Sequence, residues 1–272
     1  MKNEYSEDVK NYISNILTEK KEPKDDEYFL EVWKEWFDTE KDTANLLNSH
    51  ILPSRPVDFK EPENITGSIY SSYAGEIPMI IFGNPDDFEH FVINAAYKGV
   101  WTDEVKKQGA SFLAGKTNRF IVLSKKPYSN VPASWMGLGD ADWHEKSMIL
   151  RREHEYMHYY TRRYYGSAKQ NLHDELMADF FGIYAAFGRY EAKWFDHFMG
   201  VDGREGGRIT VYTQKLSEED RAEVLKIAGI CSSYLEEWSG SEEFASMNIT
   251  QKIDHLCELG IEGMIQKKNG TV

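Results

Sequence analysis

A short His-Glu-x-x-His pattern contains the residues of this sequence that are best suited to chemistry. It consists of His154, Glu155 and His158, and it falls within a segment of helical character. Residues four positions apart lie one turn apart on the same helical face, so two imidazole groups at this spacing can bind one metal ion. Glu155 then lies beside the metal, where its carboxylate can accept a proton from water without acting as a ligand. The pattern therefore indicates a catalytic zinc site.

A third protein ligand is expected for catalytic zinc, and a candidate lies one short loop after the motif. Glu175 and Asp179 are four positions apart and share a helical face. That face continues with small residues, which let two helix backbones approach closely: Ala178, Gly182 and Ala186. We therefore predict Glu175 as the third ligand, with His173 and Asp174 as its competitors. Asp179 is predicted to accept the second ring N–H of a ligating histidine.

This arrangement resembles the gluzincin branch of the zincin superfamily, in which an HExxH motif is followed by ExxxD. The resemblance covers about residues 77–187. It implies a zincin-like fold in which His154, His158 and Glu175 are zinc ligands, Glu155 is the general base and Asp179 supports a ligand. The chain lacks both the HExxHxxGxxH pattern of metzincins and the Gly-x-Met-Glu-Asn motif of gluzincin aminopeptidases.

The reaction implied by the resemblance is metal-assisted hydrolysis of a peptide bond. Zinc activates water, Glu155 accepts its proton, and a further donor stabilises the oxyanion. The sequence offers several candidate donors without selecting one: Tyr159, Tyr160, Arg162, Arg163, Tyr164, Tyr165, His197 and Tyr212.

Three functions compete for this pattern. The first is a zinc-dependent metallopeptidase with one Zn²⁺ per chain and a peptide or protein substrate. The second is a non-proteolytic zinc-binding regulatory or peptide-binding protein on a zincin fold, because no specificity motif or pro-segment is recognisable. The third is a metal-free helical protein, since a chain of this length contains HExxH by chance in roughly one case in a hundred.

The composition of the 272-residue chain narrows the class of protein further. Its formal net charge of −13 argues against binding to nucleic acid or to an anionic membrane surface. No apolar run approaches the roughly 20 residues of a membrane span, and the start MKNEYSEDVK has no signal-peptide pattern. The two cysteines, Cys231 and Cys257, indicate thiols in a reducing compartment. We expect a cytoplasmic protein without nucleic-acid or membrane partners, and the sequence predicts no oligomeric state.

The elements ahead of the motif are predicted from periodicity. The apolar spacing from Phe29 to Phe37 indicates a helix within residues 25–51, and prolines make residues 52–70 a connector. A buried strand is expected at 77–82, followed by a helix at 84–98 with Asn84 as its N-cap. Segments 110–114 and 119–124 indicate a hairpin joined through 115–118, and 125–139 is expected to be irregular or an edge strand.

Helices dominate the rest of the chain. The motif helix is expected at 143–165, ending before Gly166, and further helices are expected at 172–187, 191–199, 217–238 and 248–265. Asp140, Asp142 and His144 could bind a second metal such as calcium, although a turn with a helix N-cap is favoured. The glycine-rich segment 200–207 lacks phosphate-loop spacing and is predicted to be a mobile loop.

These elements predict an α+β fold with a small mixed sheet packed on the HExxH helix. Residues 1–272 are expected to form a single zincin-like unit. It comprises a helical N-terminal region at 1–60, a metal-binding core at 70–200 and C-terminal helices at 215–268.

Overall fold

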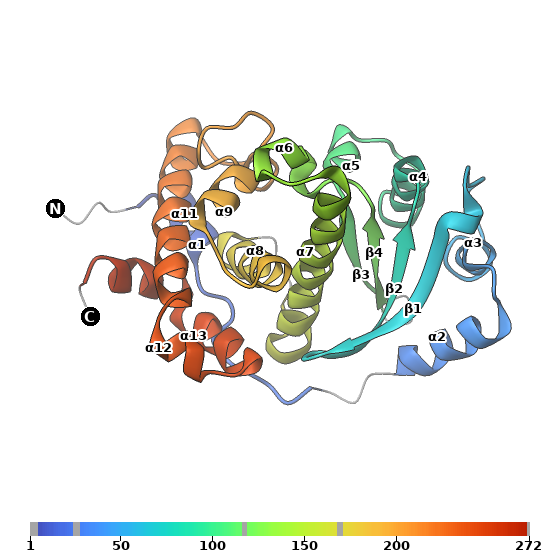
Figure 1. Cartoon of the computed structure of the whole chain (residues 1–272), viewed down its shortest axis with the longest axis horizontal. Helices are drawn as coiled ribbons and strands as arrows, with labels where there is room; N and C mark the ends of the chain where they lie inside the picture. The colour runs from blue at the N-terminus through green and yellow to red at the C-terminus, as the bar shows by residue number, and fades with distance from the viewer. Residues whose placement is uncertain (1–4, 24–27, 116–118, 168–170, 271–272) are drawn as a thin grey trace. The chain divides into compact units, whose positions relative to one another are not determined.

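The predicted α+β class is confirmed by the computed structural model, which describes residues 5–23, 28–115, 119–167 and 171–270 (Figure 1). About 61% of the chain is helical, and the strands form one four-stranded sheet. The chain divides into a sheet unit, Pro23–Tyr156, and a helical unit made of Met1–Glu22 and Met157–Val272. The predicted division into a core at 70–200 and C-terminal helices at 215–268 stays a prediction.

The sheet has the strand order β1-β2-β4-β3. Its strands are β1 (Ile65–Ser72), β2 (Gly75–Phe82), β3 (Ala110–Ala114) and β4 (Arg119–Ser124). Strands β2 and β4 are parallel neighbours at the centre, and the two edge strands pair antiparallel to them. The predicted hairpin of β3 and β4 is therefore confirmed, while residues 116–118 of its turn lie outside the described residues.

Strand β1 corrects the prediction that residues 52–70 are only a connector. It pairs with β2 over its full length, from Ile65 opposite Phe82 to Ser72 opposite Gly75. Of its eight residues only Ile65 is buried, because β1 is an edge strand with much of its surface in solvent. Its sequence therefore lacks the alternation of apolar and polar residues that marks a half-buried strand.

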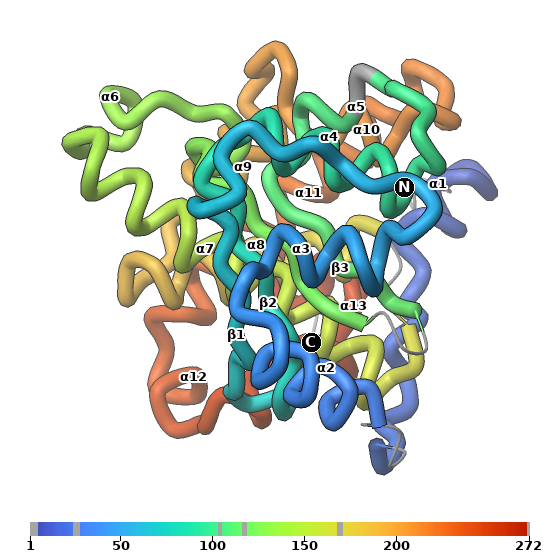
Figure 2. The backbone as a smooth tube through the Cα atoms, turned by 90° about the vertical axis from the view of Figure 1, so that its right-hand side faces the viewer, coloured from blue at the N-terminus to red at the C-terminus, as the bar shows by residue number. Residues whose placement is uncertain are grey.

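Helices cover both faces of the sheet within the sheet unit. They are α2 (Tyr28–Thr39), α3 (Thr43–Leu46), α4 (Pro85–Ala96), α5 (Asp103–Lys107), α6 (Ala133–Met136) and the beginning of α7 (Asp140–Tyr160). Helices α2, α3 and α4 lie on one side and α7 on the other (Figures 1 and 2). The apolar face predicted for α2 meets the sheet, where buried Trp33 packs on Phe120 with ring centroids 4.8 Å apart.

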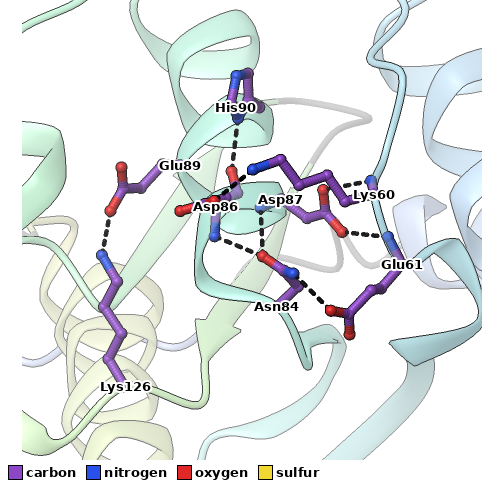
Figure 3. Close-up of polar contacts among 8 residues, drawn as sticks. All are labelled: Lys60, Glu61, Asn84, Asp86, Asp87, Glu89, His90 and Lys126. Carbon is purple, nitrogen blue, oxygen red and sulfur yellow. Dashed lines mark hydrogen bonds and ion pairs between the residues drawn. The ribbon is translucent and has the colours of Figure 1, made fainter.

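The start of α4 is fixed by polar contacts with the segment before β1 (Figure 3). Asn84 caps the helix as predicted, accepting hydrogen bonds from the backbone N–H groups of Asp86 and Asp87. The buried carboxylate of Asp87 accepts from the N–H groups of Lys60 and Glu61, at 2.8 and 2.9 Å. These bonds hold the connector against the helix that covers the sheet.

Helix α7 is held to the sheet unit by a tyrosine inside the HExxH motif. The hydroxyl of Tyr156, which is fully buried, lies in the turn between β1 and β2. It accepts hydrogen bonds from the N–H groups of Ser72 and Ala74, at 3.0 and 3.1 Å, and donates one to the Gly75 carbonyl. One side chain thus satisfies three backbone groups of the hairpin turn.

Helix α8 lies at the centre of the helical unit. This unit contains the end of α7 and α1 (Glu7–Ile13), α8 (Leu172–Phe187), α9 (Ala192–Met199), α10 (Ile209–Tyr212), α11 (Glu218–Ser239), α12 (Glu242–Ser246) and α13 (Ile249–Lys268). Helices α1, α9, α11 and α13 pack against α8, and every α8 residue from Leu172 to Ile183 is buried. None of the described helices combines the length and apolar character needed to cross a membrane.

We expect Tyr156→Phe to lower the free energy of unfolding by about 2 kcal/mol, because backbone groups in the β1–β2 turn lose their hydrogen-bond partner. Urea denaturation measures the change. Tyr28→Phe makes the same chemical change at a 65% exposed position and should leave stability unchanged. Equal stability of Tyr156→Phe and the wild type would contradict this account of the anchor.

Candidate metal centre

Helix α7 presents the two motif histidines one turn apart on a buried surface. His154 is 4% exposed and His158 is 8% exposed, so both imidazole groups are largely shielded from solvent. The helix continues into a π-helical turn, Thr161–Tyr165, and the chain then leaves through Gly166 in the left-handed conformation. The prediction that this helix ends before Gly166 is therefore confirmed. The helix begins at Asp140 instead of residue 143, and its last turn is π-helical.

Glu175 joins the histidines from the first turn of α8. Asn171 caps this helix by accepting a hydrogen bond from the backbone N–H of Asp174 at 2.9 Å. Glu175 is only 1% exposed, and its Oε1 lies 3.6 Å from Nε2 of His158. His154, His158 and Glu175 each offer one ligand atom, and these three atoms lie within 4.8 Å of one another.

The donor set and its spacing fit a zinc ion. Two imidazole nitrogens and one carboxylate oxygen are a known ligand set for catalytic zinc, which keeps its fourth position open. Zinc–ligand bonds of about 2.0–2.1 Å in a tetrahedron set two donor atoms roughly 3.4 Å apart, close to the separation of His158 and Glu175. Because a buried carboxylate is costly unless its charge is compensated, a divalent cation would also stabilise Glu175 in this position.

Asp174 supports His158, a role that the sequence had assigned to Asp179. Its Oδ2 lies 2.8 Å from Nδ1 of His158, and Thr161 donates a hydrogen bond to its Oδ1 at 3.1 Å. This arrangement fixes the imidazole so that Nε2 faces Glu175. The acceptor beside the second ring nitrogen of His158 is therefore Asp174, whereas the prediction named Asp179. Asp174 was also a competing candidate for the third ligand, and in the structure it makes this supporting contact.

Asp179 instead forms an ion pair with Arg208. The carboxylate is completely buried, and its Oδ2 accepts a hydrogen bond from Nη2 of Arg208. No sequence pattern pointed to this pairing, because Arg208 follows the glycine-rich segment 200–207 and belongs to no recognised motif. A buried charge without a partner of opposite sign is strongly destabilising, and here the guanidinium of Arg208 is the partner of Asp179.

His173, the other competitor for the third ligand, faces helix α13. Its Nε2 donates a hydrogen bond to the carbonyl of Leu256 at 2.9 Å. Helix α13 breaks at Gly260, where φ is 62°, so carbonyls in the preceding turn need partners other than helical N–H groups. Burial lowers the pKa of His173, so it is neutral in this contact.

Tyr128 contacts His154, and sequence reasoning missed it. Its hydroxyl lies 3.1 Å from Nδ1 of His154. Arg151, on α7, fixes the tyrosine's position by donating hydrogen bonds to the carbonyls of Ser124, Lys126 and Pro127, immediately before it. Residues 125–139 form no strand; they contain a 3-10 turn, Tyr128–Asn130, and the short helix α6, which the prediction of an irregular segment or an edge strand did not include. No periodic signal points to Tyr128.

Two of the candidate oxyanion donors have a structural partner instead. Tyr160 and Tyr165 both donate hydrogen bonds to Oδ1 of Asp254, at 2.8 and 3.0 Å. Burial raises the pKa of each hydroxyl, and Asp254 adds to the effect. For Tyr212, burial raises the pKa of the hydroxyl well above its usual value, and the charge of Glu175 adds to the effect.

The less favoured alternative, a second metal at Asp140, Asp142 and His144, concerns the start of α7. Asp140 and Asp142 lie in the first turn of α7, where acidic side chains favour the helix dipole. In the part of the chain that the structure describes, the metal-capable group comprises His154, His158 and Glu175 and excludes these two carboxylates and His144. The favoured reading of this segment as a helix start is therefore confirmed.

The geometry defines a candidate mononuclear metal centre of two histidines and one glutamate. Residues 116–268, more than half of the chain, match a family of unknown function (DUF7005). The chain belongs to this family, and the match includes helices α7 and α8. No curated protein and no solved structure matches the chain.

We expect Asp174→Asn to weaken zinc binding about 10- to 100-fold, because the amide cannot stabilise the ring N–H of His158 as a carboxylate does. Competition with a chromophoric chelator measures the affinity. Asp254→Asn removes a carboxylate that binds Tyr160 and Tyr165 instead, and it should leave zinc affinity unchanged. Wild-type affinity in Asp174→Asn would show that this hydrogen bond does not support the site.

Proposed function

We propose that this chain is a zinc-dependent metallopeptidase with a zincin-like fold of the gluzincin type. It binds one Zn²⁺ per chain and hydrolyses a peptide or protein substrate in the cytoplasm. The observation that carries the proposal is the convergence of His154, His158 and Glu175 from two helices, with their donor atoms within 4.8 Å in a buried position.

Each residue of the site has a distinct role in this proposal. His154, His158 and Glu175 hold the metal, which supplies a Lewis acid that acidifies water and polarises a carbonyl group when it is bound. Glu155, 9% exposed and adjacent to His154 on α7, accepts the proton from water at its carboxylate. Asp174 keeps the His158 ring in the orientation and tautomer that ligation needs.

A metal-free arrangement is the direct rival of this proposal. A protonated His158 between the carboxylates of Asp174 and Glu175 would also account for separations of 2.8 and 3.6 Å. A proton and a divalent cation both compensate buried negative charge, so metal content decides between the two.

We expect the purified protein to contain about one zinc ion per chain. His158→Ala should contain almost none, because the metal loses one of its three protein ligands. Plasma mass spectrometry measures the ratio. The matched control is His144→Ala, an exposed histidine on the same helix, which should retain the metal. A wild-type protein without metal after incubation with zinc would refute the zinc site and favour the protonated histidine.

We expect Glu155→Gln to lower peptide hydrolysis about 10²- to 10⁴-fold while zinc stays bound, since the amide cannot accept the proton. A peptide-library digest followed by mass spectrometry measures cleavage. Glu145→Gln changes an exposed glutamate on α7 and should cleave as the wild type does.

Cleavage by Glu155→Gln at the wild-type rate would contradict the assigned base. If no zinc-loaded preparation cleaves any peptide, while a peptide binds both the wild type and Glu155→Gln, the peptidase proposal fails. A non-proteolytic zinc-binding protein would then replace it.

A further inference from the structure

The segment that carries Tyr128 is held by side chains from one face of helix α7. That face consists of residues three or four positions apart along the helix, namely Trp143, Ser147, Arg151 and His154. The indole N–H of Trp143 donates a hydrogen bond to the carbonyl of Val131 at 2.7 Å. The Ser147 hydroxyl oxygen accepts one from the backbone N–H of Tyr128 at 3.0 Å. The backbone is therefore fixed at Tyr128 itself and three residues further on.

Arg151 fixes the backbone before Tyr128 and also contacts its ring. The arginine is 3% exposed, and its hydrogen bonds satisfy the carbonyls of Ser124, Lys126 and Pro127. The central carbon of its guanidinium lies 5.7 Å from the centroid of the Tyr128 ring, within the range of a cation–π contact. These contacts hold the ring where its hydroxyl lies 3.1 Å from Nδ1 of His154.

The backbone directly after Tyr128 is strained. Ser129 and Asn130 have φ angles of 50° and 55°, in the left-handed region that residues with a Cβ rarely adopt. Among the residues that the structure describes, one further non-glycine residue, Lys98, has a positive φ. Such strain persists only where surrounding contacts enforce it, and it is concentrated at functional sites. The chain therefore adopts an unfavourable conformation immediately beside the residue that contacts His154.

We propose that Tyr128 is a positioning residue of the metal centre, which accepts a hydrogen bond from Nδ1 of His154 and thereby makes Nε2 the ligand atom. A neutral imidazole carries one ring proton, and a hydrogen-bond partner on one nitrogen selects the tautomer that ligates through the other. The hydrogen bond also fixes the rotation of the ring. This inference rests on the proposed zinc site.

The tyrosine differs in charge from the partner of the other histidine. His158 has the carboxylate of Asp174 beside its Nδ1, at 2.8 Å, and Glu175 brings a second carboxylate. A hydroxyl fixes the His154 ring without adding a further negative charge to this buried group. An uncharged acceptor also raises the basicity of the imidazole less than a carboxylate does, so we expect a smaller effect on zinc affinity than at Asp174.

We expect Tyr128→Phe to bind zinc about 10-fold more weakly than the wild type, because His154 loses the hydrogen bond that orients its ring. The phenyl ring keeps the contact with Arg151, so the segment stays folded. Competition with a chromophoric chelator gives the affinity. In proton–nitrogen NMR spectra of the zinc-loaded protein, the Nδ1–H signal of His154 should change position in Tyr128→Phe, because its hydrogen bond is lost.

The matched control is Tyr70→Phe. The Tyr70 hydroxyl donates a hydrogen bond at 2.6 Å to Oε1 of Glu153, the residue before His154 on α7. Tyr70→Phe therefore also removes one tyrosine hydroxyl that contacts this helix, although its partner is not a candidate ligand. It should keep the wild-type zinc affinity and the wild-type His154 signal.

Four results would overturn the inference. The first is a Tyr128→Phe variant with wild-type zinc affinity and an unchanged His154 signal, even if its metal-free form melts at a lower temperature. The second is an equal loss of affinity in Tyr128→Phe and Tyr70→Phe, which would indicate a general loosening of α7. The third is ligation of zinc through Nδ1 of His154 in the wild type. The fourth is a wild-type protein that binds no metal, which would refute the proposed function as well, whereas the first three leave it standing.

Discussion

The burial of helix α8 is the constraint on which the candidate site depends. Four ionisable residues, His173, Asp174, Glu175 and Asp179, lie in the part of this helix, Leu172 to Ile183, in which every residue is buried. A polar group buried without a partner costs about 1–3 kcal/mol, and an isolated charge costs more. Neighbouring elements therefore have to supply a partner for each of them: the end of α7, the turn at α10 and the broken helix α13.

Helix α7, which carries the HExxH motif, has two roles: it presents the candidate metal ligands and it binds the sheet. Two motif residues face the candidate metal site, while Tyr156, between them, binds the β1–β2 turn. Just before the motif, Arg151 binds the carbonyls after β4, and Glu153 accepts a hydrogen bond from Tyr70 of β1 at 2.6 Å. Residues at the unspecified positions in and beside the motif thus fix the helix that carries the histidines.

The features that depend on neighbouring residues could be predicted from the amino-acid sequence alone. Helical periodicity and local capping located α4 with Asn84 at its start, the motif helix with Gly166 at its end, and α8. The interval of four between His154 and His158 required them to share a helical face. Such predictions use only residues within one helix or at its ends, so they needed no knowledge of packing.

Contacts between side chains that are distant in the sequence depend on how the helices and strands pack together. The edge strand β1 gains its order from pairing with β2, because only one of its residues is buried. Whether Asp174 or Asp179 supports His158 depends on how α8 is rotated against α7, and the sequence spacing of either residue permits the contact. Tyr128 reaches the site from the segment between β4 and α6. Such contacts join residues that are 16 or more positions apart in the chain, and their geometry follows from packing across the whole unit, which local periodicity does not encode.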